Sequence, residues 1–345
     1  MRDSIRLAAR ALCAVLAGCA PLPAPRPGSL QPEVIFTRPS PLSRGAEIVR
    51  RTLPPLTARY GQEALAARGE ALREQSIDLQ GERFALYVPA GEPPAGGYGL
   101  LVFISPGDEA VRPNYWRAPL DRHRLIFVSA AGSGNEAGLL DRRLPLALLA
   151  YENVRARYPL DPDRVYVGGL SGGSRVAEMV ALGYPDVFRG ALLIAGSDPI
   201  GGEQGIYLPP EDLFHRFQRS RLVFVTGARD DVNLDDDAVT LHSLRDFCVF
   251  NLEVKQPPRM GHELPDANAL DSALDALDQR PAPDLRKLAE CNASLQRELA
   301  SGLAAAGAAR AAGDRDGARA RLRQLDARYG GLAASAILAL DETLR

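Results

Sequence analysis

From residue 76 onward, short apolar runs alternate along the chain with longer stretches of helical periodicity. Runs rich in branched and aromatic residues predict strands at residues 84–88, 100–104, 125–130, 164–170, 191–197, 221–227 and 248–254. Helical periodicity is found at residues 143–157, 173–183, 236–246 and 264–278. Strands that alternate with helices predict an α/β fold, with a mostly parallel sheet and helices on both faces. An alternating stretch before residues 84–88 indicates that the first strand belongs to an antiparallel hairpin.

The last part of the chain, residues 281–345, has a different composition. Ala, Leu, Arg and Glu dominate it, and it contains no strand-like run. It predicts two or three helices, broken near Gly313, Gly317 and the pair Gly330-Gly331. These helices form either a cap on the α/β body or a module that binds a protein partner. The cap is favoured because two helices alone bury little apolar surface.

Two segments precede the predicted body of residues 76–280. Residues 20–44 are rich in proline, which predicts an extended tether. Residues 45–75 show a helical pattern interrupted by Pro54 and Pro55. We therefore expect residues 19–75 to be a linker with a short helical segment.

The first residues have the pattern of an export signal. Arg2, Arg6 and Arg10 precede a short apolar stretch, ALCAVLA, at residues 11–17. The sequence Leu16-Ala17-Gly18-Cys19 then resembles the lipobox of bacterial lipoproteins. The resemblance implies removal of residues 1–18, acylation of Cys19, and attachment to a membrane of the bacterial cell envelope, on the periplasmic or surface face of the outer membrane. An ordinary N-terminal helix with a chance cysteine is the alternative.

Composition and charge narrow the class of protein. The 345 residues are 46% hydrophobic and carry a net charge of −2, which supports a sizeable core and gives no electrostatic case for nucleic acid as a partner. No apolar run reaches the length of a membrane-spanning helix. Apart from Cys13 in the predicted signal and Cys19 at the predicted acylation site, the chain has two cysteines, Cys248 and Cys291. In an oxidising compartment they predict a disulfide, with two buried free thiols as the alternative.

The sequence Gly169-Leu170-Ser171-Gly172-Gly173 fits the pattern G-x-S-x-G. It follows the predicted strand at 164–170 and precedes the predicted helix at 173–183, the context that a nucleophile elbow requires. Small residues on both sides allow strand and helix to approach closely, and the helix N-terminus favours developing negative charge on Ser171. We therefore predict Ser171 as a nucleophile; a glycine-rich turn with a spectator serine is the alternative.

A serine nucleophile needs a base and an orienting acid, which follow it along the chain in this fold. The strand at 221–227 leads to Asp230 and Asp231, and we predict Asp230 as the acid with Asp231 as the fallback. The next strand leads to His262, the base that satisfies both chain order and loop context. No second histidine stands at helical spacing from it, so neither a metal nor a cofactor is expected.

The tetrahedral intermediate of acyl transfer needs N–H donors for its oxyanion. We predict that the N–H of Gly172, directly after the nucleophile, is one donor. The second is expected from the loop Ser105-Pro106-Gly107-Asp108 after the strand at 100–104. Asp108 is the predicted donor, with Gly107 as the alternative.

Several of these motifs resemble one branch of the α/β-hydrolases, the polyhydroxybutyrate depolymerases and the feruloyl and acetylxylan esterases. The resemblance spans roughly residues 80–280 and rests on DPDRVY (161–166), the elbow, YPDVF (184–188) and GHELP (261–265). It implies an exported serine ester hydrolase with Ser171, Asp230 and His262 in the triad positions. The family usually has His-Gly where this chain has Pro106-Gly107.

The expected substrates are small or oligomeric esters, because no repeated aromatic face of a polymer-binding module is evident. Two other functions are alternatives to the esterase. One is a serine peptidase of related fold, which usually carries an additional large domain. The other is a degenerate hydrolase that serves as a surface binding lipoprotein. The ordered Ser171, Asp230 and His262 favour the esterase.

Overall fold

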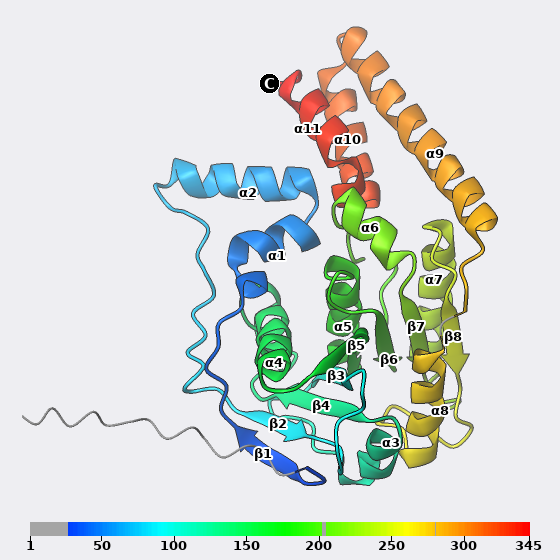
Figure 1. Ribbon diagram of the computed structural model, residues 1–345. Helices are drawn as coiled ribbons and strands as arrows, with labels where there is room; N and C mark the ends of the chain where they lie inside the picture. Colours follow the sequence, from blue (N-terminus) through cyan, green and yellow to red (C-terminus); the bar gives the residue numbers. More distant parts are fainter. Residues whose placement is uncertain (1–26, 202–204, 280) are drawn as a thin grey trace, which may run out of the picture.

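The computed structural model describes residues 27–201, 205–279 and 281–345. The predicted signal peptide with Cys13, and the predicted acylation site Cys19, lie outside the described residues. The chain forms an eight-stranded sheet in the order β1-β2-β4-β3-β5-β6-β7-β8 (Figure 1). Its strands are β1 (Leu30–Val34), β2 (Phe84–Tyr87), β3 (Tyr98–Ile104), β4 (Leu125–Ala130), β5 (Leu160–Leu170), β6 (Gly190–Ile194), β7 (Arg221–Val225) and β8 (Leu252–Lys255).

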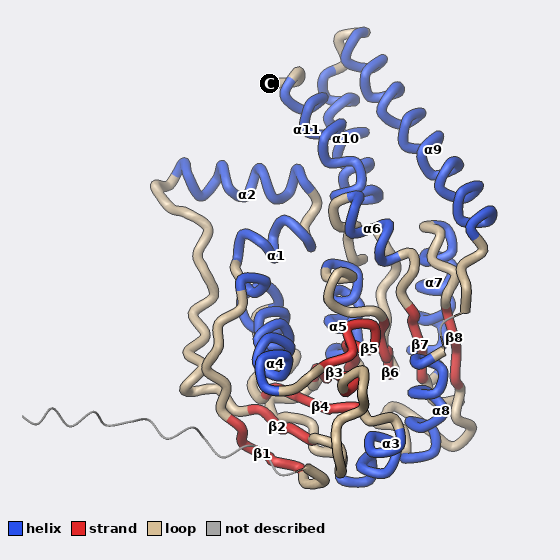
Figure 2. The backbone as a smooth tube through the Cα atoms, in the orientation of Figure 1, coloured by secondary structure: helices blue, strands red, loops and turns tan. Residues whose placement is uncertain are grey.

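Strand β2 is antiparallel to both of its neighbours, and all pairs from β4 to β8 are parallel. Helices cover both faces of this sheet (Figure 2). One face packs against α3 (Arg117–Arg122) and α8 (Ala267–Asp278), and the other against α4 (Leu144–Arg157), α5 (Gly172–Gly183) and α7 (Asp231–Asp246). Successive residues of β3 alternate between the two apolar clusters, as the pleat of a strand requires. This architecture confirms the predicted α/β-hydrolase fold.

The sequence predicts the last strand at residues 248–254, and the start of this prediction is wrong. Cys248 and Val249 instead close the end of α7, where the N–H of Val249 donates to the carbonyl of Leu244 at 2.9 Å. Cys248 adopts a left-handed backbone with φ 64°, which a strand residue does not. The apolar run reflects burial of this turn, and β8 begins only at Leu252.

The proline-rich segment differs from the expected tether. Leu30–Val34 forms the edge strand β1 and pairs antiparallel with β2, so the expected local hairpin is wrong and β2 finds its partner far away in the sequence. Phe36 is fully buried. The two helices that follow, α1 (Gly45–Thr52) and α2 (Pro55–Ala67), pack against the body; Pro54 and Pro55 separate them because proline favours a helix start.

The C-terminal segment forms three helices, α9 (Leu285–Ala311), α10 (Arg315–Tyr329) and α11 (Ala334–Glu342). Gly313 (φ 82°) ends α9 and Gly330 ends α10, as expected, but Gly317 lies inside the first turn of α10. The helices stand beyond α6 (Glu211–Phe217) in Figure 1. Their buried side chains belong to the same apolar cluster as α4 and α5, which favours the cap; these side chains include Leu295, Leu299, Leu322, Tyr329 and Ile337.

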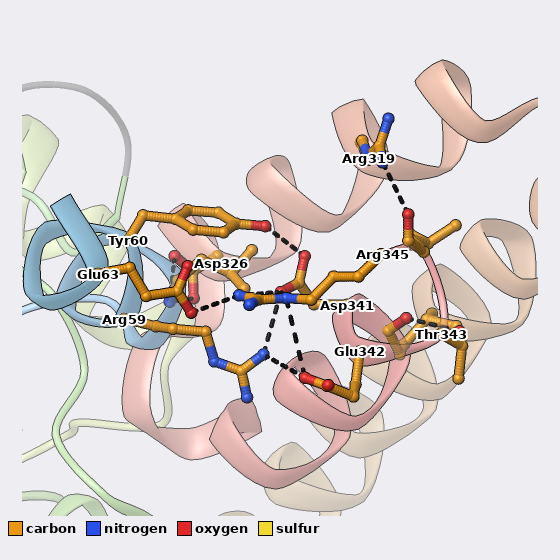
Figure 3. A network of polar contacts seen from close by, with 12 residues as sticks. Arg59, Tyr60, Glu63, Arg319, Asp326, Asp341, Glu342, Thr343 and Arg345 are labelled. Carbon is orange, nitrogen blue, oxygen red and sulfur yellow. Dashed lines mark hydrogen bonds and ion pairs between the residues drawn. The ribbon is translucent and has the colours of Figure 1, made fainter. Parts of the chain in front are cut away.

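Helix α2 is fastened to the C-terminal helices by a polar network (Figure 3). At its centre, the Asp341 carboxylate accepts hydrogen bonds from Tyr60 and Arg59 of α2. Arg345 bridges back to Glu63 of α2 at 2.7 Å. Nearby, the buried Asp326 of α10 accepts the N–H of Leu56 at 3.1 Å, in the first turn of α2. These contacts join segments at opposite ends of the chain.

A disulfide between Cys248 and Cys291 adds a covalent link to this arrangement, with an S–S distance of 2.06 Å. It joins the turn after α7 to helix α9. Across the part of the chain that the structure describes, no helix combines the length and apolar character needed to cross a membrane.

Candidate active site

Ser171 stands on a sharp turn between β5 and α5. Its backbone has φ 55° and ψ −126°, a conformation that side-chain-bearing residues rarely adopt. The turn is held because the N–H of Ser171 donates to Ile194 O of β6 at 2.8 Å and its carbonyl accepts from Ser174 at 2.9 Å. The predicted strand–turn–helix context is therefore present, with Ser171 at the N-terminus of α5.

The glycines of this turn lie where the surrounding backbone leaves no room for a Cβ atom. A Cβ at Gly169 would collide with the backbone of Gly173, and a Cβ at Gly173 would collide with Ile104 O of β3. Gly196 after β6 has a similar role, since its Cβ would lie 2.7 Å from the carbonyl oxygen of Ser171. Helix α5 can therefore begin directly against the strand ends, which aims Ser171 at the carboxyl edge of the sheet.

Asp230 and His262 lie together at this edge, in the loops after β7 and β8. Nδ1 of His262 donates to Oδ2 of Asp230 at 2.8 Å. Asp230 is buried, whereas the His262 side chain is 47% exposed. This arrangement suits an imidazole that is fixed on one side and open to a reacting group on the other.

The alternative acid, Asp231, is exposed in the first turn of α7 and makes no hydrogen bond through its side chain within the described ranges. Asn233 instead supports Asp230, since its Nδ2 donates to both carboxylate oxygens at 2.9 and 3.0 Å. Burial alone would raise the pKa of Asp230, but hydrogen bonds from Asn233 and His262 outweigh it and hold that pKa below its usual value. Asp230 is therefore an ionised partner for His262 at neutral pH.

Backbone contacts between the two loops place these side chains. The N–H of Arg229 donates to Met260 O at 3.2 Å, and that of Ala228 donates to Pro257 O at 3.1 Å. Gly227 permits this approach, because a Cβ there would overlap Met260 O. On the far side of the His262 loop, Trp116 donates from Nε1 to Pro265 O at 2.8 Å.

The other histidines lie elsewhere. His123 is buried and contacts Asp278 at 2.9 Å through Nδ1. His242 is 80% exposed on α7, and His215 is exposed on α6. Within the described residues, no cluster of His, Cys, Asp or Glu has the geometry to hold a metal ion.

The predicted oxyanion donors differ in whether they are already engaged. The N–H of Gly107 donates to Oγ of Ser105 at 3.1 Å, so it is already in use. The N–H groups of Gly172 and Asp108 have no acceptor among the residues that the structure describes. Of the two N–H groups considered for the second donor, that of Asp108 is therefore unengaged and that of Gly107 is not.

Three side chains that contact the candidate site or its loops were not identified from the sequence. Asn233 could have been found from its spacing, three residues after Asp230 in the first helical turn. The Asp237 carboxylate connects the segments that follow β6 and β7, because it accepts hydrogen bonds from the hydroxyls of Ser197 and Thr226, both at 2.6 Å. Arg143, buried behind the oxyanion loop, contacts segments that are distant in sequence, so no local pattern identifies it.

At the level of sequence, the similarity to a known protein covers a short stretch of the chain. No protein-family model matches the chain. A stretch of 45 residues is 51% identical to poly(3-hydroxyalkanoate) depolymerase C of Paucimonas lemoignei. This match covers 13% of the chain and 11% of that depolymerase, so the chain spans about a tenth of the length of this relative. Over that stretch, the predicted resemblance to polyester depolymerases is confirmed.

Solved structures with similar folds include named hydrolases. S-formylglutathione hydrolase of Staphylococcus aureus is 14% identical, with a TM-score of 0.45, over 57% of this chain and 92% of that one. The poly(3-hydroxybutyrate) depolymerase LpqC of Bordetella parapertussis is 17% identical, with a TM-score of 0.43, over 61% and 88%. A ferulic acid esterase is 15% identical, with a TM-score of 0.42, over 56% and 89%.

Proposed function

We propose that this chain, which has the α/β-hydrolase fold, is a serine hydrolase that cleaves carboxylic esters through an acyl-enzyme. The observation that carries the proposal is the pairing of Asp230 with His262 at the same sheet edge as the strained Ser171. A spectator serine has no need of a costly backbone conformation, and a retired site has no need of a buried acid bonded to a half-exposed histidine.

In the proposed reaction, His262 takes the proton of Ser171 as its Oγ attacks the ester carbonyl carbon. The resulting oxyanion is stabilised by the N–H groups of Gly172 and Asp108. His262 then protonates the departing alcohol, and the acyl group remains on Ser171. Water, deprotonated by His262, attacks the acyl-enzyme; the acid is released as the Ser171–acyl bond breaks and His262 returns the proton to Oγ of Ser171. Asp230 holds the imidazole in the required tautomer and stabilises its positive charge.

Small and oligomeric esters are the proposed substrates. The 45-residue match to a protein named poly(3-hydroxyalkanoate) depolymerase C supports this class. The open position of His262, with nearly half of its side chain exposed, is compatible with substrates that extend from the site. We propose soluble hydroxyalkanoate oligomers and simple aryl esters as the first compounds to test.

The decisive assay compares ester and amide substrates with purified protein. We expect hydrolysis of p-nitrophenyl acetate and release of monomer from a hydroxybutyrate oligomer, with both activities lost in Ser171→Ala. Cleavage of peptide p-nitroanilides at a higher kcat/KM than esters would instead indicate a peptidase. A folded protein that cleaves neither would indicate a binding role.

We also propose that the protein is held at the bacterial cell envelope by lipid on Cys19. The proposal rests on the sequence Leu16-Ala17-Gly18-Cys19 and the preceding apolar stretch. Acyl chains anchor a protein because each buried CH₂ contributes about 0.8 kcal/mol. In a bacterial host, Cys19→Ala should leave the membrane fraction; retention there after a salt wash would contradict the anchor.

A further inference from the structure

Arg143 is a buried cation without a carboxylate partner. It ends the short helix η3 (Leu139–Arg143), and only 7% of the residue is exposed. Within the described ranges, no carboxylate forms an ion pair with it. Burial lowers the pKa of its guanidinium below the usual value. A buried charge without a counter-ion is costly unless hydrogen bonds compensate for the water it has lost.

All the acceptors of Arg143 belong to the loops that surround the oxyanion region. Its Nε donates to Ser133 O at 2.8 Å, and its Nη2 donates to Ser105 O at 3.4 Å and to Oδ1 of Asn135 at 3.2 Å. Ser105 begins the loop that carries Asp108. The guanidinium therefore connects the loop after β3 with the loop after β4.

These two loops are also joined along their backbones. The N–H of Asn135 donates to Pro106 O at 2.9 Å, and that of Gly132 donates to Asp108 O at 2.6 Å. The side chain of Asn135 consequently lies over the elbow. A Cβ on Gly172 would overlap the Asn135 carboxamide, so this amide lies directly against the residue that supplies the first oxyanion donor.

Arg143 determines which way the Asn135 amide points. A guanidinium only donates hydrogen bonds, so the oxygen of the carboxamide has to face it. Nδ2 of Asn135 then faces away from Arg143, and it has no acceptor among the residues that the structure describes. Measured from the position of a Cβ on Gly172, Oδ1 is the nearer atom and Nδ2 lies at 3.0 Å, so both ends of the carboxamide adjoin this residue and the N–H end is the one without an acceptor.

We propose that Asn135 is a third oxyanion donor, a catalytic residue, and that Arg143 is the positioning residue that orients it. This inference rests on the proposed ester hydrolysis and deepens it. In the tetrahedral intermediate, Nδ2 of Asn135 donates to the oxygen that also accepts from Gly172 and Asp108. The buried positive charge of Arg143 adds a favourable field at that oxygen, because burial limits screening by water.

Replacement of Asn135 provides the first test. We expect Asn135→Ala to lower kcat for p-nitrophenyl acetate about 10²-fold, with KM changed less than about threefold, because one donor to the transition state is lost. The inhibition constant of a trifluoromethyl ketone, which forms a tetrahedral adduct with the serine, should rise by a similar factor. Glu136→Ala, an exposed neighbour in the same loop, is the matched control and should match the wild type in all three quantities.

Asn135→Asp separates catalysis from structure. The new carboxylate gives Arg143 the counter-ion it lacks, so we expect the Tm to rise above that of the wild type. The same change removes the donor and places negative charge beside the oxyanion, so kcat should fall below that of Asn135→Ala. A lower kcat at a Tm equal to or above that of the wild type excludes loss of folding as its cause, and the neutral Asn135→Ala reports the loss of the donor.

Arg143→Lys tests the positioning role while keeping the charge. A lysine lacks the planar fork, so we expect kcat to fall about tenfold, with little change in KM. If Asn135→Ala retains kcat and ketone affinity within about threefold, or if its loss is confined to KM, the inference is overturned. If the wild type hydrolyses no ester, or if Ser171→Ala still does, the proposed function itself fails. The two failures are therefore distinguishable.

Discussion

At the residue scale, two adjacent aspartates of the same chemistry have different environments. Asp230 is buried and bonded to His262 and Asn233, whereas Asp231 projects into solvent from the first turn of α7. The difference comes from the turn at Gly227–Asp230, where the N–H of Asp230 donates to Gly227 O at 3.0 Å. This turn directs one carboxylate toward the histidine and the next away from it.

We predict that Asp230→Asn lowers kcat for a small ester by roughly 10³- to 10⁴-fold, because an amide does not hold the imidazole in its active tautomer. Asp231→Asn is the matched control and should stay within about twofold of the wild type. The measurement is steady-state kinetics at neutral pH on variants with unchanged unfolding midpoints. Equal activity of the two variants, or a larger loss in Asp231→Asn, would show that the acid has been assigned to the wrong residue.

The sequence identified the candidate side chains Ser171, Asp230 and His262, but not all of the residues that contact them. Ser171 and His262 stand in motifs whose context is local, so the strand and helix around them could be read from the chain. The choice between Asp230 and Asp231 depends on one peptide orientation in a loop, which local patterns do not encode. The contact of Arg143 with Ser105 joins residues far apart in sequence, and only the folded sheet brings them together.

At the element scale, the docking of α2 on α10 depends on one buried carboxylate. Burial raises the pKa of Asp326 to about 6, although the N–H groups of Leu56 and Thr57 act in the opposite direction. A carboxyl whose pKa is higher in the folded state binds its proton more tightly there than in the unfolded chain. Its stabilising contribution is complete below the unfolded pKa of about 4 and is lost as the pH rises through about 6.

Asp326→Asn should remove this dependence, because the amide oxygen still accepts from Leu56 while the buried charge is gone. We predict that the variant gains roughly 2–3 kcal/mol relative to the wild type between pH 4 and pH 7.5. Denaturant unfolding at both pH values measures this change. Asp316→Asn, whose parent side chain is 99% exposed on the same helix, is the control. A stability difference between Asp326→Asn and the wild type that stays constant with pH would contradict the account.

Some elements could be predicted and others could not, for physical reasons. Strands β3, β4, β6 and β7 are buried along their whole length, so their residues are almost all apolar and easily found. Strand β1 is an edge strand with exposed residues and a proline at its centre, a composition shared with extended linkers. The turn at Cys248 is as apolar as a strand because the disulfide and the core bury it.

At the scale of the whole molecule, the C-terminal helices share the core of the α/β body. Leu322 of α10 is 1% exposed and belongs to the same apolar cluster as Val180 of α5 and Phe214 of α6. The disulfide between Cys248 and Cys291 links α9 to the turn after α7. The hydrogen bonds of Asp341 link α11 to α2. Residues 281–345 therefore share the apolar core of the described α/β body.

We predict that deletion of residues 281–345 yields protein that aggregates or lacks a cooperative unfolding transition, because it exposes this apolar surface. Leu322→Ala in the full chain should cost about 2–5 kcal/mol in the free energy of unfolding. Leu285→Ala, whose parent residue is 64% exposed on α9, should cost less than about 0.5 kcal/mol. A truncated protein that keeps the wild-type Tm and activity would show that these helices form a separate module.

Covalent labelling shows whether Ser171 is an activated nucleophile, the role on which the proposed ester hydrolysis depends. A fluorophosphonate probe reacts with a serine only when a base and an oxyanion hole assist the attack. We expect one adduct per chain, located on Ser171 by peptide mass mapping. Labelling should be abolished in Ser171→Ala and slowed in His262→Ala, both folded. Absence of labelling on folded wild-type protein, or an adduct on another residue, would contradict the account.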